Sequence, residues 1–194
     1  MKIAIISDTH DNLPNFKKAV DWIKSQKIKL IIHCGDIFKP DTVKEILKTF
    51  KGRAYFIFSP ADASFSGIPE KAFDNLKNVK VYSVFGEIKI PASPARLGSE
   101  SERAGGGANP VAGQAHYGAR KIAFCHFPEI AKELAKTQKY DFVFYGHTHK
   151  PWLKKIGKTK LVNPGNLANI FYKPTFAVYD TKTDKLELKI LERL

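Results

Sequence analysis

Residue types that bind metal ions follow apolar runs at four places in the chain. The fragments are Asp8-Thr9-His10, Gly35-Asp36, a lone His126 and Gly146-His147-Thr148-His149. Each comes directly after a short apolar run that is typical of a buried strand. Of the 6 histidines in the chain, four lie in these fragments, while His33 precedes Asp36 and His116 lies elsewhere. Mixed sets of imidazole and carboxylate suit Mn, Fe, Zn, Ni or Co rather than Ca or Mg alone.

Each fragment alone is a weak signal, because D-x-H and H-x-H occur by chance and a histidine at a strand end is usually just hydrogen-bonded. Their order and shared placement are a stronger signal. A carboxylate can bridge two cations, which one imidazole cannot, so Asp36 is the natural bridge. The pattern predicts a site for two divalent metal ions (Mn, Ni, Zn or Fe), whose candidate ligands are Asp8, His10, Asp36, His126, His147 and His149.

The first third of the chain reads as β-α-β-α-β. Residues 2–6, 29–33 and 54–58 are apolar runs of strand length. Between them, apolar residues recur at helical spacing: Phe16, Ala19, Val20 and Ile23 after Pro14, then Val43, Ile46, Leu47 and Phe50. This alternation predicts a parallel sheet with ligands at the carboxyl ends of its strands.

The second half is predicted to be more antiparallel. Its expected elements are strands at 79–84, 86–90, 121–126, 141–145 and 159–163, a helix that carries Ile130, Ala131, Leu134 and Ala135, and a terminal hairpin at 175–191. On a doubly wound sheet, the strand ends that carry the four metal-binding fragments lie at one edge. Four imidazoles and two carboxylates are therefore expected to converge there.

Residues 91–119 differ in composition from the rest of the chain. They contain no Lys, Ile or Phe, and they hold six of the 13 glycines. This composition is typical of a flexible linker or loop, and a structureless loop of this length is unusual in a compact domain. We interpret residues 1–194 as one domain with an atypical insertion at 91–119, which is either a natural surface insertion or a foreign, engineered segment.

Composition limits the classes of function. No apolar run approaches the roughly 20 residues that span a bilayer, and the N-terminus lacks the apolar stretch of a secretory signal, so a cytoplasmic protein is expected. Cys34 and Cys125 are expected to be buried free thiols. The net charge is +13, but the lysines are scattered over predicted helix faces. They indicate solvated surface or a field that attracts anionic substrates, and no motif supports nucleic-acid binding.

Taken together, D-T-H, H-C-G-D, the strand-end His126, Y-G-H-T-H and N-P-G resemble the calcineurin-like metallophosphoesterases. The similarity is greatest to their small YfcE/MJ0936-type phosphodiesterase branch, which also includes Vps29. The resemblance implies an α/β fold, an αββα metallophosphoesterase sandwich with mixed sheets. It implies a first metal held by Asp8, His10, Asp36 and His149, and a second held by Asp36, His126, His147 and an Asn. It also implies catalytic roles for Asp36, His126 and Asp62.

The chain departs from the family pattern after the third predicted strand. Where the family has G-N-x-D, this chain has Ser59-Pro60-Ala61-Asp62, so Pro60 stands at the position of the Asn ligand. Proline has no side-chain ligand atom, and Ala61 stands where many relatives have a His. Phe127 and Pro128 likewise replace a common Gly-His. The second metal is therefore expected to bind weakly, with three protein ligands at most.

Two classes of function remain open from the sequence. One is a metal-dependent phosphodiesterase or phosphatase that acts on a phosphorylated small molecule or a nucleotide. The other is a catalytically weak or inactive binding scaffold of the Vps29 kind, or an engineered variant. The retained His and Asp residues favour the enzyme, whereas Pro60 and the segment 91–119 favour the scaffold.

Overall fold

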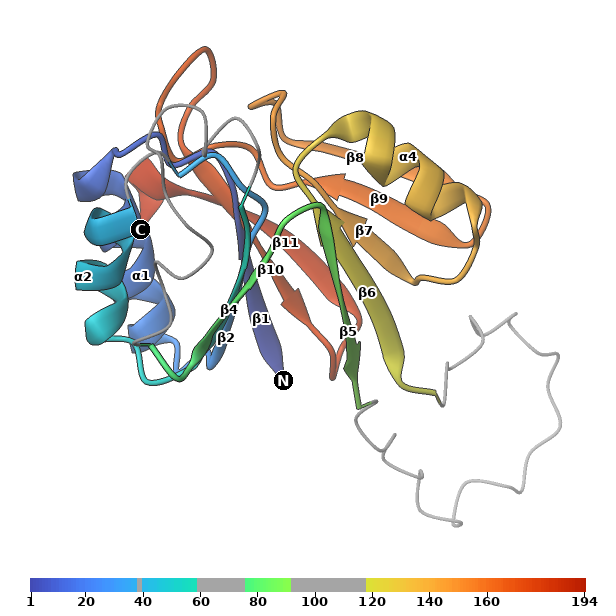
Figure 1. The fold of residues 1–194 in the computed structure, drawn as a ribbon, viewed down its shortest axis with the longest axis horizontal. Coiled ribbons are helices and arrows are strands. Elements are labelled where there is room, and N and C mark those ends of the chain that lie inside the picture. Colours follow the sequence, from blue (N-terminus) through green and yellow to red (C-terminus); the bar gives the residue numbers. More distant parts are fainter. Residues whose placement is uncertain (38–39, 59–75, 92–117) are drawn as a thin grey trace, which may run out of the picture.

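Two β-sheets lie face to face and helices cover their outer faces (Figure 1). The structure is a computed structural model that describes residues 1–37, 40–58, 76–91 and 118–194. Helices α1 (Leu13–Ser25) and α2 (Pro40–Lys48) lie on one side, and α4 (Pro128–Lys136) lies on the other. This order of layers is the predicted αββα sandwich.

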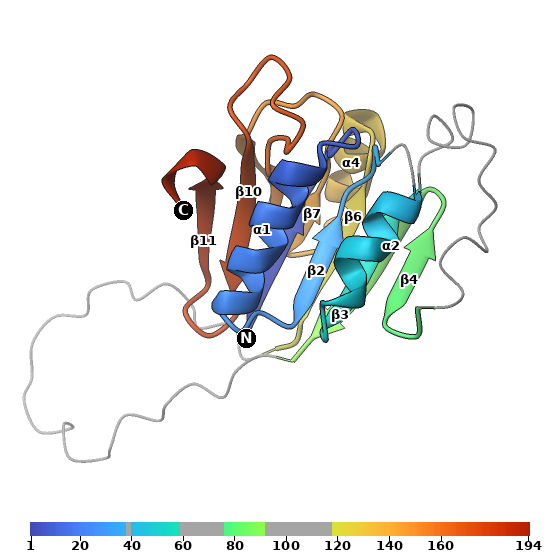
Figure 2. The same ribbon diagram turned by 90° about the vertical axis from the view of Figure 1, so that its left-hand side faces the viewer.

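The first sheet has the strand order β11-β10-β1-β2-β3-β4 (Figure 2). Its strands are β1 (Lys2–Ile6), β2 (Leu30–His33), β3 (Arg53–Ile57), β4 (Val79–Tyr82), β10 (Thr175–Asp180) and β11 (Lys185–Ile190). Strands β1, β2 and β3 are parallel, as the β-α-β-α-β pattern predicts. Strand β4 is also parallel to β3, although the sequence placed it in the more antiparallel half. The terminal hairpin adds β10 antiparallel to β1 and β11 antiparallel to β10, and a short 3-10 helix, η3 (Leu191–Arg193), ends the chain.

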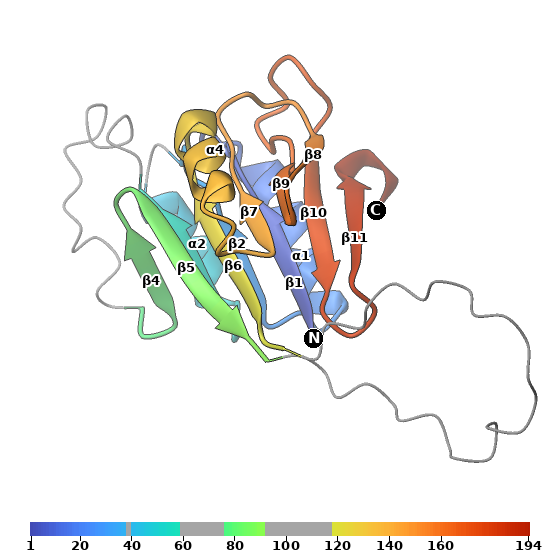
Figure 3. The ribbon, with the colours of Figure 1, turned by 90° about the vertical axis from the view of Figure 1, so that its right-hand side faces the viewer.

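The second sheet has the strand order β5-β6-β7-β9-β8 (Figure 3). Its strands are β5 (Phe85–Ile90), β6 (Arg120–Cys125), β7 (Phe142–Phe144), β8 (Trp152–Ile156) and β9 (Thr159–Asn163). The central strands β6, β7 and β9 are parallel, and the outer strands β5 and β8 are antiparallel to their neighbours. The antiparallel character that the sequence predicts thus applies to the edges of this sheet and to the terminal hairpin.

Alternation along the buried strands divides the core into layers. In β1, Ile3 and Ile5 belong to the layer between the sheets, whereas Ala4 and Ile6 face the helices of the first sheet. Successive side chains of a strand point to opposite faces, so a strand buried on both faces has a continuous apolar sequence. The predicted face of α1 is confirmed, since Phe16, Ala19, Val20 and Ile23 are its buried residues. Both cysteines are buried free thiols, as predicted.

Two elements differ from the sequence prediction. The predicted strand 79–84 ends at Tyr82 as β4, and the chain crosses to the second sheet before β5 begins at Phe85. Strand β8 was not predicted, because its residues are mostly exposed and show no apolar alternation. It lies at an edge of the sheet, where β9 is its one paired strand among the described residues.

The atypical segment connects two paired strands. Strands β5 and β6 are antiparallel, and their register ends with Ile90 opposite Arg120. Residues 92–117 of the predicted insertion lie outside the described residues. The pairing therefore indicates that a tight turn could join these strands. The single-domain interpretation of 1–194 stays a prediction.

Candidate metal centre

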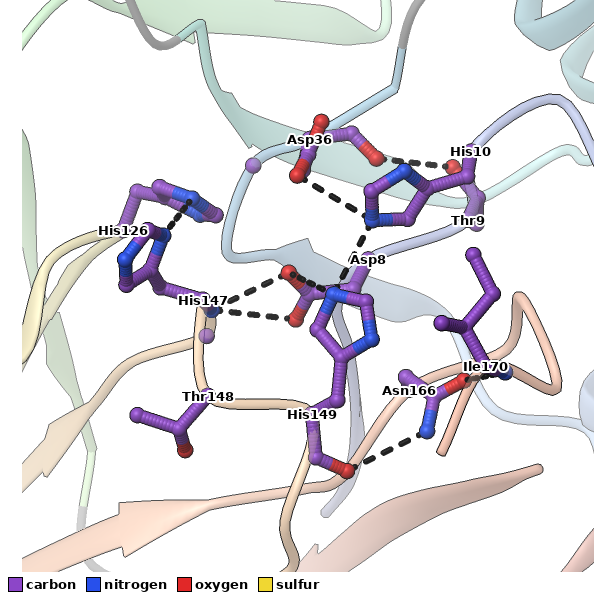
Figure 4. A network of polar contacts seen from close by, with 12 residues as sticks. Asp8, Thr9, His10, Asp36, His126, His147, Thr148, His149, Asn166 and Ile170 are labelled. Atoms are coloured by element: carbon purple, nitrogen blue, oxygen red, sulfur yellow. Dashed lines mark hydrogen bonds and ion pairs between the residues drawn. The ribbon is translucent and has the colours of Figure 1, made fainter. Parts of the chain in front are cut away.

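The predicted ligands come from loops that follow strands of both sheets. Asp8 and His10 follow β1 and Asp36 follows β2, all in the first sheet; His126 follows β6, and His147 and His149 follow β7, in the second. Figure 4 shows these side chains directed toward one another. The expectation of a single sheet edge was wrong, because the strand ends belong to two sheets. The predicted convergence of the six side chains is nevertheless found.

Four of the side chains form a compact cluster, which we call the first cluster: Asp8, His10, Asp36 and His149. One ligand atom from each lies within 4.8 Å of the others. His10 Nε2 is 3.0 Å from His149 Nε2 and 3.1 Å from Asp36 Oδ2. His149 Nε2 is 3.5 Å from Asp8 Oδ1. Two imidazole nitrogens and two carboxylates therefore face one small volume.

The remaining two histidines form a second pair beside this cluster. His147 Nδ1 lies 3.3 Å from His126 Nε2. His126 Nδ1 is 3.0 Å from the carbonyl oxygen of Cys34, and since a carbonyl can only accept, Nδ1 carries the proton there. In the neutral ring, Nε2 then keeps its lone pair for a ligand, as metal-binding histidines require. Asp62 and Pro60 lie outside the described residues, so their part in this half of the site stays a prediction.

The site loops hold several non-glycine residues in the left-handed backbone region. The φ angles are 50° at Asp8, 43° at His10, 62° at Asp36, 68° at His147 and 58° at His149. Such residues are uncommon, and each costs on the order of 1 kcal/mol. Hydrogen bonds between loops offset this cost: the Asp8 amide donates to the Gly35 carbonyl over 3.0 Å, and the Gly146 amide donates to the His126 carbonyl over 3.0 Å.

Gly146 allows the two sheets' loops to meet. A Cβ atom at this position would overlap the Ser7 hydroxyl and lie 2.7 Å from Asp8 Oδ2. With glycine there, the next amide, that of His147, donates to both Asp8 carboxylate oxygens over 3.0 and 3.2 Å. The backbone of the Gly-His-Thr-His loop thus orients the Asp8 carboxylate. The same loop carries the imidazoles of His147 and His149 into the site.

Burial and neighbouring charges shift the pKa of the carboxylates in opposite directions. Burial, reinforced by the charge of Asp36, raises the pKa of Asp8 to about 7. Burial also raises the pKa of Asp36, but the hydrogen bond and charge of His10 outweigh it and leave that pKa below its usual value. Among the described residues, the Asp36 carboxylate pairs with His10 and the Asp8 carboxylate with His149, and neither pairs with Lys or Arg.

Burial lowers the pKa of two histidines of the site, His126 and His149. It lowers the pKa of His126 to about 4 and the pKa of His149 in the same direction. Both imidazoles are therefore neutral near pH 7, which is the form that binds metal ions. The buried carboxyl group of Asp8, the partly buried carboxylate of Asp36 and the neutral imidazole of His149 are directed at one volume. A divalent cation bound there would balance the carboxylate charge. The donor set fits Mn, Fe, Zn or Ni.

His33 has a structural role that the sequence did not reveal. Its Nδ1 accepts from the Gly35 amide over 3.2 Å, so Nε2 carries the proton and lies 3.3 Å from Thr9 Oγ1. Its ring stacks on Phe56 with centroids 5.1 Å apart, and burial lowers its pKa to about 3. His33 thus joins the loops that carry Asp8 and Asp36 without entering the first cluster.

Two asparagines position the loop that carries His147 and His149. Asn163, the first residue of the N-P-G turn, donates from Nδ2 to the Gly146 carbonyl over 2.9 Å and to Thr148 Oγ1 over 3.1 Å. Asn166 donates to the His149 carbonyl over 3.1 Å. Asn163 belongs to the N-P-G motif of the family resemblance, which named no contact partner for it. Asn166 was missed because a single asparagine after a turn carries no spacing signal.

Phe127 replaces the common Gly-His after the strand-end histidine. Its ring centroid lies 4.8 Å from that of His126 and 5.1 Å from that of His147, in edge contacts. Pro128 then begins α4, where its missing amide proton is no loss. The substitution therefore adds an aromatic contact to the second pair and removes a further candidate ligand.

A comparison with family models gives one match that covers most of the chain. Residues 1–184 match the model of the calcineurin-like phosphoesterase superfamily domain. Among curated proteins, the chain is 24% identical over 194 residues to phosphodiesterase MJ0936 of Methanocaldococcus jannaschii, which covers 99% of this chain and 100% of the relative.

Solved structures share the fold. A structure described as a novel archaeal phosphodiesterase superimposes with a TM-score of 0.74 at 23% identity, over 98% of this chain and 99% of the other. Wild-type Vps29 of Entamoeba histolytica in complex with zinc has a TM-score of 0.56 at 16% identity, over 98% and 99% of the two chains.

Among the described residues, no helix is long and apolar enough to span a bilayer.

Proposed function

The chain belongs to the calcineurin-like phosphoesterase superfamily, and from this premise we propose that it is a metal-dependent phosphodiesterase. The observation that carries the proposal is the first cluster, in which Asp8, His10, Asp36 and His149 direct their ligand atoms at one volume. Similarity over the full length of phosphodiesterase MJ0936 supports phosphodiesters as the substrates. The net charge of +13 would favour the approach of such anions.

In this proposal the first cluster holds one divalent ion, and Asp36, His126 and His147 hold a second. The ions would be Mn, Ni, Zn or Fe. Bound there, they would supply Lewis-acid stabilisation to the phosphate and to its attacking and leaving oxygens. Asp36 is the proposed bridge, since its carboxylate touches His10 and its charge also acts on the pKa of His126 on the other side.

The protein's own contribution is to orient the ligands before substrate arrives. The His147 amide fixes both oxygens of Asp8, and the Cys34 carbonyl fixes the tautomer of His126. Because these hydrogen bonds are already formed within the protein, the ligands do not need to reorganise when charge develops on the phosphate. Asp36, His126 and Asp62 are the proposed catalytic residues, and the role of Asp62 rests on the sequence alone.

A scaffold with little catalysis is the second candidate, and Pro60 is the observation that favours it. Without the family's Asn, the second site has at most Asp36, His126 and His147 as protein ligands. Three protein ligands and water still make a possible catalytic site, but with weaker binding. A titration with Mn²⁺ separates the candidates if hydrolysis of bis(p-nitrophenyl) phosphate is followed together with metal binding. Turnover that rises with occupancy supports the enzyme, whereas stoichiometric binding without turnover supports the scaffold.

A further inference from the structure

Phe171 is a strongly exposed aromatic side chain beside the first cluster. Of its surface, 90% is exposed, compared with 38% for Ile170 and 42% for Tyr172 on either side. Its ring centroid lies 6.1 Å from that of His149, with the planes inclined by 51°. A large apolar ring therefore faces solvent next to a proposed metal ligand.

The loop that presents this ring is held in place by Asn166. The Asn166 side chain donates to the carbonyls of His149 and Tyr172 over 3.1 and 3.3 Å, and its Oδ1 accepts from the Ile170 amide over 3.2 Å. Figure 4 shows Asn166 between His149 and Ile170. One side chain thus ties the loop on which Phe171 lies to the backbone of the metal-site loop.

The backbone at Phe171 is unfavourable for a bulky residue. Its φ is 62°, in the left-handed region, which aromatic residues rarely adopt. Such outliers persist where the surrounding contacts determine them, and they gather at ligand clamps and active sites. Here the contacts of Asn166 fix the neighbours of Phe171 and leave its ring exposed.

Phe127 provides a contrast within the same site. Its ring already contacts His126 and His147 and is partly buried. Phe171 has one face near His149 and most of its surface available to a ligand. Of these two aromatic residues, Phe171 is therefore the one that could accept a stacking partner without displacing a packed side chain.

We infer that Phe171 stacks on an aromatic ring of the phosphoester substrate and so selects nucleoside phosphoesters over those of plain sugars. The inference rests on the proposed function, since it assumes that a phosphate binds at the first cluster. A base joined to that phosphate through a sugar would extend from the cluster toward the neighbouring loop, where Phe171 lies beside His149. Base stacking on an aromatic residue tolerates different bases, so the selection is for a ring rather than for one base.

The test compares two probes that share ribose and phosphate but differ in the base: adenosine 5′-monophosphate and ribose 5-phosphate. Calorimetry on the Mn²⁺-loaded protein gives the Kd of each. We expect the nucleotide to bind about tenfold more tightly, within the range of a single base stack. Phe171→Ala and Phe171→Leu should remove this ratio and leave the affinity for ribose 5-phosphate unchanged.

The pair Phe171→Leu and Phe171→Trp separates stacking from general apolar contact. Leucine keeps an apolar side chain without a ring, whereas tryptophan keeps a ring and should preserve the tenfold ratio. The indole of Phe171→Trp should also change its fluorescence with the nucleotide and not with ribose 5-phosphate. Equal affinities in the unchanged protein, or a ratio that survives Phe171→Ala, would overturn the inference.

Parallel hydrolysis of bis(p-nitrophenyl) phosphate distinguishes failure of this inference from failure of the proposed function. Metal-dependent hydrolysis without preference for the nucleotide contradicts the role of Phe171 alone. A protein that binds neither probe and does not hydrolyse the diester contradicts the phosphoesterase proposal, and the role of Phe171 with it.

Discussion

His10 Nε2 and His149 Nε2 lie 3.0 Å apart, although 139 positions separate the two residues in the sequence. One follows a strand of the first sheet and the other follows a strand of the second. The contact therefore depends on how the two sheets are stacked, and any ion held by both nitrogens would join the two halves of the fold. Metal binding is consequently expected to affect stability as well as catalysis.

Asp36→Ala is expected to remove most metal binding, because it takes away the proposed bridge between the two sites. In the unchanged protein, Mn²⁺ at about 100 times its Kd should raise the free energy of unfolding by about 2.7 kcal/mol, since the ion binds only the folded state. The Asp36→Ala variant should show little of this gain. Thermal unfolding with and without Mn²⁺ measures it. An equal gain in the variant would show that Asp36 is not a principal ligand.

Ser59→Gly with Pro60→Asn is expected to tighten the second site, since it restores the Gly-Asn that the family has at these positions. The prediction rests on the sequence, because residues 59–62 lie outside the described residues. Metal stoichiometry at limiting Mn²⁺ and turnover of bis(p-nitrophenyl) phosphate should both increase. His126→Ala in this double variant should abolish the increase by removing another ligand of the same ion. If stoichiometry and rate do not change, either Pro60 does not stand at the Asn position or a neighbour such as Asp62 already supplies the ligand.

Replacing residues 91–119 with Asn-Gly is expected to preserve the fold. Ile90 and Arg120 are already opposite each other in the β5–β6 ladder, so a two-residue turn could connect them. Loop closure costs less entropy for a short loop, so the melting temperature should stay equal or rise. Circular dichroism and thermal unfolding test this. A large loss of stability would indicate that the segment is docked, and a loss of activity alone would indicate a part in substrate binding.

His33→Gln is expected to flatten the pH dependence of stability in the metal-free protein. Burial lowers the pKa of folded His33 to about 3, compared with 6.5 for an ordinary histidine. Between these values the unfolded state binds the proton more readily, so stability falls as the pH falls from about 6.5 toward 3, by up to about 1.4 kcal/mol per pH unit.

Urea unfolding at several pH values measures this slope, and the difference between the two proteins isolates His33 from other groups. Two of those other groups, Asp8 and His126, change the stability of the folded state with pH in opposite directions. Asp8, with its pKa raised to about 7, makes the folded state less stable as the pH rises, whereas His126, with a pKa of about 4, acts in the same direction as His33. Parallel slopes in the two proteins would mean that His33 is not buried in its neutral form.

Sequence patterns predicted the elements whose side chains are buried and periodic. Strand β1 and the buried face of α1 have the predicted residues, because burial on two faces or on one stripe leaves a clear apolar pattern. Strand β8 lacked such a signal, since exposed residues at an edge are not selected for apolarity. The exposed lysines on helix faces likewise carry little information about the fold.

The ligand residues could be predicted from their types and their positions after strands, but their arrangement could not. Which sheet each strand joins is decided by packing between distant segments, so the sequence suggested one sheet edge where the structure has two. The positions of Phe171 and Asn166 depend on hydrogen bonds to His149 and Tyr172 that have no local sequence signature.

The central claim is that the first cluster holds a metal ion on which phosphodiester hydrolysis depends. The most direct measurement strips the protein with a chelator, adds back Mn²⁺ in steps, and records metal occupancy and hydrolysis of bis(p-nitrophenyl) phosphate in the same samples. The account predicts that hydrolysis is absent without metal, rises with occupancy, and stays near background in a parallel titration of His149→Ala. Full occupancy with a rate no greater than that of His149→Ala would contradict it.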